Sequence, residues 1–151
     1  MSSMIGFECI FADIYEIWKF LKTDELDINS YCVISDDMLI IPNGLMTPVV
    51  MPEKFNKEFC IDMLDYKCVC ERLVLYLYPN SATEYADIAV YDDYVHSQCE
   101  IVILAYDAYY LEIYCKNSNR LKMILQKAIE FPNTKINEKY WGSDSRTGMY
   151  V

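Results

Sequence analysis

Two apolar segments joined by only two residues constrain this chain more than any other feature of its sequence. Residues 100–106 and 109–115 each have the length of a strand, and in the second segment successive side chains alternate between two sets. Only Asp107 and Ala108 separate the segments, which predicts a tight hairpin although the favoured glycine is missing. Because a two-residue connection joins strands only in antiparallel fashion, we expect an antiparallel sheet with these strands at its centre.

Strand and helix patterns on both sides of this hairpin extend the sheet and supply the layers that cover it. Asp36 and Asp37 lie between two short strand patterns and predict the turn of a second hairpin. A short helical turn is expected at residues 91–97. Further strand patterns lie at residues 4–10, 31–35, 38–41, 72–78, 85–90, 135–141 and 147–151. Longer helical patterns lie at residues 12–22, 52–64 and 118–131.

This order of elements is typical of an α+β fold, because adjacent strands outnumber strand–helix–strand crossovers. No repeat and no Gly/Ser-rich or Pro-rich linker interrupts the chain, which has four glycines in 151 residues. We expect residues 1–151 to form a single α+β domain, a mostly antiparallel sheet with about four helices packed on it. The chain shows neither an apolar run near the roughly 20 residues that span a bilayer nor a signal peptide, so we expect a cytoplasmic protein that does not enter membranes.

Cysteine and histidine usage argues against metal and nucleophile chemistry. The chain has seven cysteines, an odd number, and without an export signal we expect free, mostly buried thiols. Cys68 and Cys70 form a C-x-C pair rather than the C-x₂-C pair typical of zinc sites. His96 is the one histidine; a helical turn would place it on the same face as Cys99, but no third group that would orient it is recognisable. We predict no catalytic residue, no metal and no cofactor.

Charge divides the chain into an acidic body and a basic tail. The net charge is −10; residues 1–115 contain 20 acids and 6 bases, whereas residues 116–151 contain 3 acids and 7 bases. An acidic body repels phosphate backbones, because nucleic-acid binding depends on Lys and Arg. The same charge attracts basic proteins, although a high net charge can also serve solubility alone. We therefore expect a basic protein partner rather than a nucleic acid.

Tyrosine is over-represented, with 14 of 151 residues. Its ring is apolar and its hydroxyl is polar, so tyrosine is enriched at half-wet surfaces and interfaces. Two interpretations stay open: an outward aromatic and acidic sheet face that contacts a partner, or rings that pack beneath a helix with their hydroxyls at its rim. The first interpretation predicts a contact surface of strand residues and one adjacent acidic pair, which is otherwise common in turns: Tyr76, Tyr78, Tyr110, Glu112, Tyr114, Asp92 and Asp93.

Three segments carry a resemblance to a known family. They are residues 97–104 (SQCEIVIL), residues 109–116 with their LEIYCK run, and residues 145–149 (SRTGM). With these segments the chain resembles a family of small bacterial proteins, mostly from Gram-positive spore formers, known as domain of unknown function 2691. The resemblance spans most of the chain and is concentrated in its last third. The matching segments are strand-like, and the family brings no assigned activity and no site residues.

Two classes of function fit these observations. The acidic body, the tyrosine excess and the missing catalytic set favour a protein-binding module, such as an immunity or inhibitor protein that occludes a basic toxin or nuclease. The alternatives are a small enzyme or ligand sensor that uses carboxylates and tyrosines in a pocket, and a homo-oligomeric structural protein. A cleft where acids and tyrosines converge would favour the enzyme or sensor.

Overall fold

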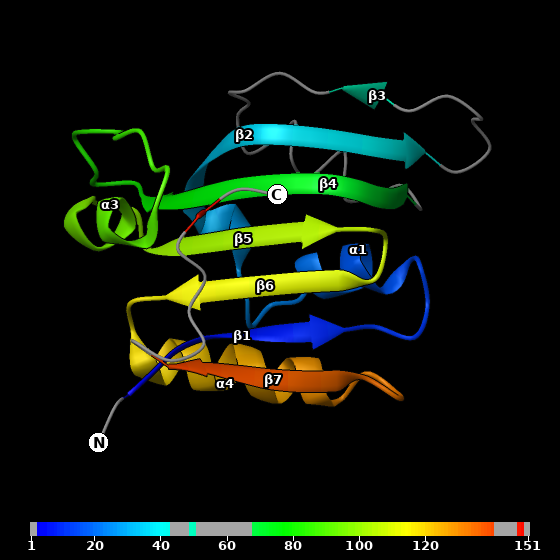
Figure 1. Cartoon of the computed structure of the whole chain (residues 1–151). Coiled ribbons are helices and arrows are strands. Elements are labelled where there is room, and N and C mark those ends of the chain that lie inside the picture. The colour runs from blue at the N-terminus through cyan, green and yellow to red at the C-terminus, as the bar shows by residue number, and fades with distance from the viewer. Residues whose placement is uncertain (1–2, 43–48, 51–67, 141–147, 150–151) are drawn as a thin grey trace.

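One antiparallel sheet organises the part of the chain that the structure describes (Figure 1). The computed structural model describes residues 3–42, 49–50, 68–140 and 148–149. The strand order is β3-β2-β4-β5-β6-β1-β7, and every neighbouring pair is antiparallel. The strands are β1 (Met4–Ile10), β2 (Tyr31–Pro42), β3 (Val49–Val50), β4 (Cys68–Pro79), β5 (Ile101–Tyr106), β6 (Tyr110–Cys115) and β7 (Lys135–Tyr140).

Helices accompany this sheet, which confirms the predicted α+β class. The described residues form three α-helices, where about four were expected: α1 (Glu16–Leu21), α3 (Tyr91–His96) and α4 (Ser118–Ile129). A 3-10 turn, η1 (Ile28–Ser30), precedes β2. The helix predicted at residues 52–64 lies outside the described residues. No helix in the described part of the chain is long and apolar enough to cross a membrane.

The central hairpin forms, but its connection is one residue longer than predicted, because Tyr106 pairs with Tyr110 and residues 107–109 join β5 to β6. Asp107 and Ala108 have positive φ angles, 52° and 67°, in the left-handed region that glycine and asparagine usually occupy. The turn is held against β4, because the Asp107 and Ala108 amides donate to the carbonyl oxygens of Glu71 and Cys70 at 3.1 and 2.9 Å. These bonds explain how an alanine is kept in the left-handed region.

The second predicted hairpin, at Asp36 and Asp37, is wrong. The two short strand patterns belong to one continuous strand, β2, which pairs with β4 along its length. Ser35 pairs with Leu75 and Asp37 with Val74, so Asp36 is an extra residue and the strand contains a bulge. Because β2 pairs with the 12-residue strand β4, the chain forms a bulge where the local sequence favours a turn.

The two faces of the sheet are covered by different parts of the chain. Helices α1 and α4 lie behind the sheet in Figure 1 and pack their apolar stripes on one face. Asn117 caps α4, since its side chain accepts a hydrogen bond from the Arg120 amide at 3.0 Å. The other face packs against residues 82–94 and Met149. The sheet is thus buried on both faces over its central strands, and this second cover holds the candidate site.

Candidate functional site

Residues 81–96, which we call the acidic lobe, connect β4 to β5 and end in helix α3 (Figure 1). Their sequence contains four acids and neither lysine nor arginine. The acids are Glu84, Asp87, Asp92 and Asp93. From residue 73 to residue 115 the chain has no lysine or arginine at all. The lobe is therefore the outermost part of a long acidic segment.

Tyrosine side chains from β4 hold the acidic lobe by its main chain. The Tyr76 hydroxyl oxygen lies 3.0 Å from the carbonyl oxygens of both Ile88 and Met149, and it donates to them. The Tyr78 hydroxyl donates to the Ala86 carbonyl at 3.4 Å. Both rings are buried against the sheet. Tyr85 of the lobe adds a side-chain contact, because its ring packs on the Tyr78 ring with centroids 4.8 Å apart and its hydroxyl lies 3.6 Å from Cys32 Sγ.

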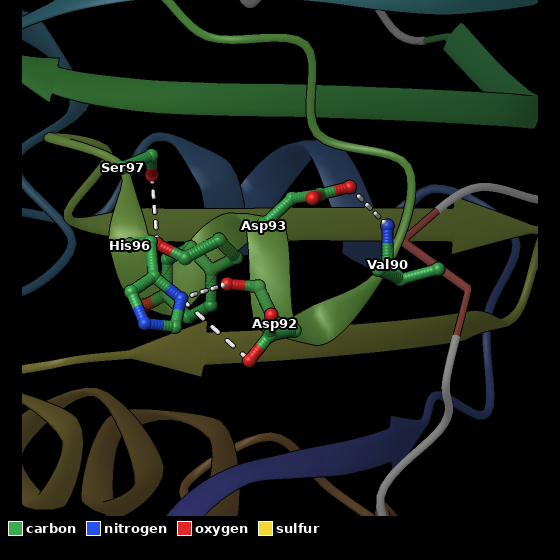
Figure 2. Close-up of polar contacts among 6 residues, drawn as sticks. Val90, Asp92, Asp93, His96 and Ser97 are labelled. Carbon is green, nitrogen blue, oxygen red and sulfur yellow. Dashed lines mark hydrogen bonds and ion pairs between the residues drawn. The ribbon is translucent and has the colours of Figure 1, made fainter.

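Helix α3 closes the lobe with local hydrogen bonds (Figure 2). The Asp93 carboxylate accepts hydrogen bonds from the amides of Ala89 and Val90 at 3.0 and 3.1 Å, which satisfies donors at the helix start. His96 Nδ1 lies 2.9 Å from the Asp92 carbonyl oxygen and 3.6 Å from its carboxylate. Asp93 thus has a structural role, whereas Asp92 points its charge into solvent.

A buried tyrosine and a lysine hold the C-terminal end of α3. The Tyr94 hydroxyl donates to the Glu100 carbonyl at 2.8 Å, and burial raises the pKa of Tyr94 above its ordinary range. Lys116 donates to the Ser97 carbonyl at 2.6 Å with its ammonium 5.0 Å from the Tyr94 ring centroid. Partial burial lowers the pKa of Lys116. A cation beside the C-terminal carbonyls of a helix is favourable, so this contact anchors the lobe to β6.

The side chains left outward on the lobe are both apolar and acidic. Tyr85, Val90 and Val95 are 43%, 40% and 46% exposed. Glu84, Asp87 and Asp92 are exposed among them. Aromatic side chains are enriched at protein interfaces and acids attract basic molecules, and the lobe exposes side chains of both kinds.

A second group of polar side chains, the Glu–Tyr cluster, lies where β1, β5 and β6 meet. It consists of Glu8, Tyr106, Tyr110, Glu112 and Tyr114. Glu8 and Glu112 are directly opposite each other on adjacent strands, an arrangement that costs free energy because the charges are alike. The Tyr106 hydroxyl oxygen lies 3.1 Å from Glu8 Oε2 and 3.4 Å from Glu112 Oε2.

Burial distinguishes the two carboxylates of this cluster. Glu112 is only 1% exposed, and the Tyr114 hydroxyl donates to its Oε1 at 3.1 Å, whereas Glu8 is half-buried. The Tyr110 ring stacks on the Tyr106 ring with centroids 5.2 Å apart. Hydrogen bonds from phenols offset part of the cost of burying a carboxylate. Two close carboxylates attract a small cation.

The predicted contact residues are thus divided among three places. Tyr76 and Tyr78 lie beneath the lobe, Asp92 and Asp93 lie on α3, and the β6 residues belong to the Glu–Tyr cluster. The expectation of an outward sheet face is wrong for four buried residues: the lobe and Met149 pack with the three tyrosines, and Glu112 is enclosed with Tyr106 and Tyr114. These four are Tyr76, Tyr78, Glu112 and Tyr114. The alternative interpretation, rings packed under a cover with their hydroxyls bonded to it, describes Tyr76 and Tyr78.

The sequence did not predict several residues of the acidic lobe and of the Glu–Tyr cluster. Glu8 and Tyr106 join Glu112 only through the register of β1 and β5 on β6, which no local pattern reveals. Tyr85 and Val90 lie in a segment whose local pattern predicts a strand, and Val95 lies in the predicted helical turn, so their exposure was not foreseen. The absence of lysine and arginine around them was the available signal.

The cysteines give no sign of a reactive pair. Cys99 is buried, with its sulfur 3.3 and 3.6 Å from the carbonyl oxygens of Ile101 and Leu77, while His96 is exposed on α3. Within the described residues, no group of three or more His, Cys, Asp or Glu could hold a metal ion. The five cysteines that the structure describes as free are Cys9, Cys32, Cys70, Cys99 and Cys115, and all but Cys32 are buried.

Comparison with known proteins places the chain in a family. No solved structure matches it. It is similar to the "Uncharacterized protein YncE" of Bacillus subtilis (strain 168), with 30% identity over 64 residues, which is 42% of each chain. The matched stretch therefore spans less than half the length of this relative. The family model "Protein of unknown function (DUF2691)" matches residues 49–150, two thirds of the chain, and the chain belongs to that family.

Proposed function

We propose that this chain is a binding module for a basic protein and that the acidic lobe is its contact surface. The observation that carries the proposal is the outward side of the lobe, where exposed Tyr85, Val90 and Val95 are interleaved with exposed acids and with neither lysine nor arginine. Several negative charges on one surface attract a basic partner and raise its association rate. Apolar side chains among them supply the area whose burial gives affinity.

The way the lobe is held supports the same proposal. Hydrogen bonds from Tyr76 and Tyr78 fix its main chain, and Asp93 fixes the start of α3. A surface that is ordered before binding loses less conformational entropy when the partner arrives. An immunity or inhibitor protein is one form of such a module, since occlusion of a basic toxin or nuclease needs the same charge complementarity.

Site-specific photo-crosslinking tests this proposal in cells that produce the protein. A photoreactive amino acid is introduced at Val95, on the lobe and 46% exposed, or at Met123, which is 53% exposed and lies on α4. We expect the Val95 variant to form a discrete adduct whose partner, identified by mass spectrometry, is basic. The yield of this adduct should fall as the salt concentration is raised, because salt screens the attraction between surface charges.

The charge requirement is tested with a variant that carries Glu84→Gln, Asp87→Asn and Asp92→Asn. These three side chains are exposed, so the fold should persist while the adduct at position 95 declines by about tenfold or more. Asp24→Asn with Glu130→Gln, two exposed acids outside the lobe, is the matched control. An acidic partner, an identical adduct from position 123, or no adduct at either position would contradict the proposal.

A sensor for a small organic cation is the second candidate function, and the Glu–Tyr cluster favours it. Its two carboxylates face each other across β1 and β6 and share the Tyr106 hydroxyl. A diamine would neutralise both charges. Titration with a short aliphatic diamine should then raise the melting temperature of the wild type but not of Glu8→Gln. Equal behaviour of the two proteins would remove this candidate.

A further inference from the structure

Two residues from the last part of the chain, Gly148 and Met149, lie against the acidic lobe, and we call them the strap. Gly148 pairs with Val90 in an isolated antiparallel bridge. The Met149 amide donates to the Ala89 carbonyl at 3.0 Å. Figure 1 shows the strap, in red, on the opposite side of the sheet from α4, and Figure 2 shows it beside Val90. The strap therefore lies along the main chain of the lobe just before α3.

The Met149 side chain fills space between the lobe and the sheet. It is completely buried, with an exposure of 0%. It packs in one cluster with Ile88 and Tyr94 of the lobe and with Tyr76 and Tyr114 of the sheet. Removal of a side chain from such a position leaves a cavity that the neighbouring residues fill only partly. The packing of the lobe on the sheet is therefore complete only while the strap is in place.

The Tyr76 hydroxyl contacts the strap and the lobe at the same time. Its oxygen lies 3.0 Å from the carbonyl oxygens of both Met149 and Ile88. A hydroxyl has one proton to donate, so the two carbonyls share it. If the strap leaves, the proton stays with the Ile88 carbonyl. Loss of this contact with the strap therefore costs less free energy than loss of a whole hydrogen bond.

The contributions that hold the strap are of the same order as the one that opposes it. Burial of the methionine side chain and its main-chain hydrogen bond favour the docked position. The conformational entropy that the backbone loses on docking opposes this position. A small difference between such contributions allows a short segment to leave and return without unfolding of the domain.

We propose that the strap is releasable: when it is docked it orders the acidic lobe, and when it leaves it frees a slot for an extended peptide. The slot has the two parts of a strand-addition site, which are a main-chain edge at Ala89 and Val90 and a pocket for a side chain. Because Met149 fills this pocket, the slot takes a peptide with a long, unbranched apolar side chain. In the docked state the chain supplies this peptide itself.

Release of the strap would also regulate the lobe as a contact surface, and this consequence rests on the proposed function. A lobe that has lost part of its packing must be ordered again when a partner binds, which lowers the affinity. A peptide that takes the place of the strap would restore the packing. The slot and the outward side of the lobe would thus be coupled through the main chain of residues 88–90.

Hydrogen exchange of full-length variants tests the effect of the strap on the lobe. Met149→Asp should release the strap, because the pocket offers an apolar environment to a carboxylate. We expect several-fold faster exchange in residues 81–96 and unchanged exchange in β5 and β6. Met149→Ala, which leaves a cavity, should show a smaller rise in the same residues and decides the matter if the first variant does not fold. Met123→Asp, at an exposed methionine of α4, is the matched control.

Fluorescence anisotropy of a labelled synthetic peptide with the sequence of residues 145–151 tests the slot. The peptide should bind full-length Met149→Asp about tenfold or more tightly than the wild type, because a filled slot lowers the apparent affinity by the fraction of chains that are open. A peptide with alanine in place of the methionine should bind neither protein.

The outcomes separate this inference from the proposed function. Unchanged exchange in the lobe of both Met149 variants, or a rise of equal size in β5 and β6, overturns the strap. Absence of binding to Met149→Asp, or equal binding of the two peptides, overturns the slot. If either happens while wild-type Val95 forms an adduct with a basic protein, the proposed function stands without this inference. Faster exchange in the lobe and selective peptide binding without any adduct would support the inference and remove the basic partner.

Discussion

Gly6 shows how one residue position makes room for the Glu–Tyr cluster. It pairs with Tyr114 across β1 and β6, and a Cβ atom at position 6 would lie 2.8 Å from Tyr114 Cδ1 and still closer to the Ile113 carbonyl oxygen. The ring can therefore lie over the backbone only if residue 6 has no side chain. From that place its hydroxyl reaches Glu112.

Substitution Gly6→Ala should lower the free energy of unfolding by about 1–3 kcal/mol, because the new methyl group meets backbone that cannot move aside. Urea denaturation checks this, with Ser3→Ala at an exposed position of the same segment as control. An unchanged denaturation midpoint for Gly6→Ala would mean that β1 and β6 are further apart than described.

Asp92 and Asp93 are adjacent in sequence but differ in what they do. Asp93→Ala removes the acceptor for the Ala89 and Val90 amides and should cost about 1 kcal/mol of stability, as is usual for a lost helix cap. Asp92→Ala should cost little, since its carboxylate is exposed. Thermal denaturation of the two single variants measures the difference. Equal losses would contradict the separate roles.

At the scale of elements, local patterns were sufficient where an element depends on its own residues. The β5–β6 hairpin, α3 and α4 form close to where their patterns place them. The bulge at Asp36 was not predictable, because two acids between short strand patterns suit a turn equally well, and only pairing with β4 decides. The burial of Tyr76 could not be predicted for a similar reason. The alternating pattern assigns side chains to the two faces of a strand, but the segments that cover each face come from distant parts of the sequence.

The acidic lobe should loosen when its main-chain anchor is removed. Tyr76→Phe keeps the ring but removes the donor to the Ile88 and Met149 carbonyls. We expect a loss of about 1–2 kcal/mol and faster hydrogen exchange of amides in residues 81–96. Tyr109→Phe, at an exposed ring, is the control for removal of a hydroxyl. Unchanged exchange in the lobe of Tyr76→Phe would show that other contacts suffice to hold it.

At the scale of the whole molecule, buried thiol and phenol groups make the free energy of unfolding depend on pH. Burial raises the pKa of Cys9 and Cys99 from 9.0 to about 12, and that of Cys115 to about 11. Burial likewise raises the pKa of Tyr31 and Tyr78 from 10.0 to about 12. Each of these groups holds its proton more tightly in the folded chain than in the unfolded chain. Lys116 acts in the opposite sense, but it is one group against these five and Tyr94.

The stabilisation that these protonated groups contribute should therefore be complete below about pH 9, and the free energy of unfolding should fall as the pH rises toward about 12. Urea midpoints between about pH 7 and about pH 11 measure this, and Cys9→Ala should show a shallower fall than the wild type because one titrating group is gone. A midpoint that stays constant across this range would contradict the burial of these thiols and phenols.

The hydrogen bonds from Tyr76 and Tyr78 end on atoms that every amino acid possesses. Substitutions on the outside of residues 81–96 leave those acceptors in place, so the shape of the segment can persist while its chemistry drifts. Variants of this chain with a substituted exterior could thus meet different ligands with one unaltered framework. The same property makes this stretch a suitable position for grafting new recognition sequences.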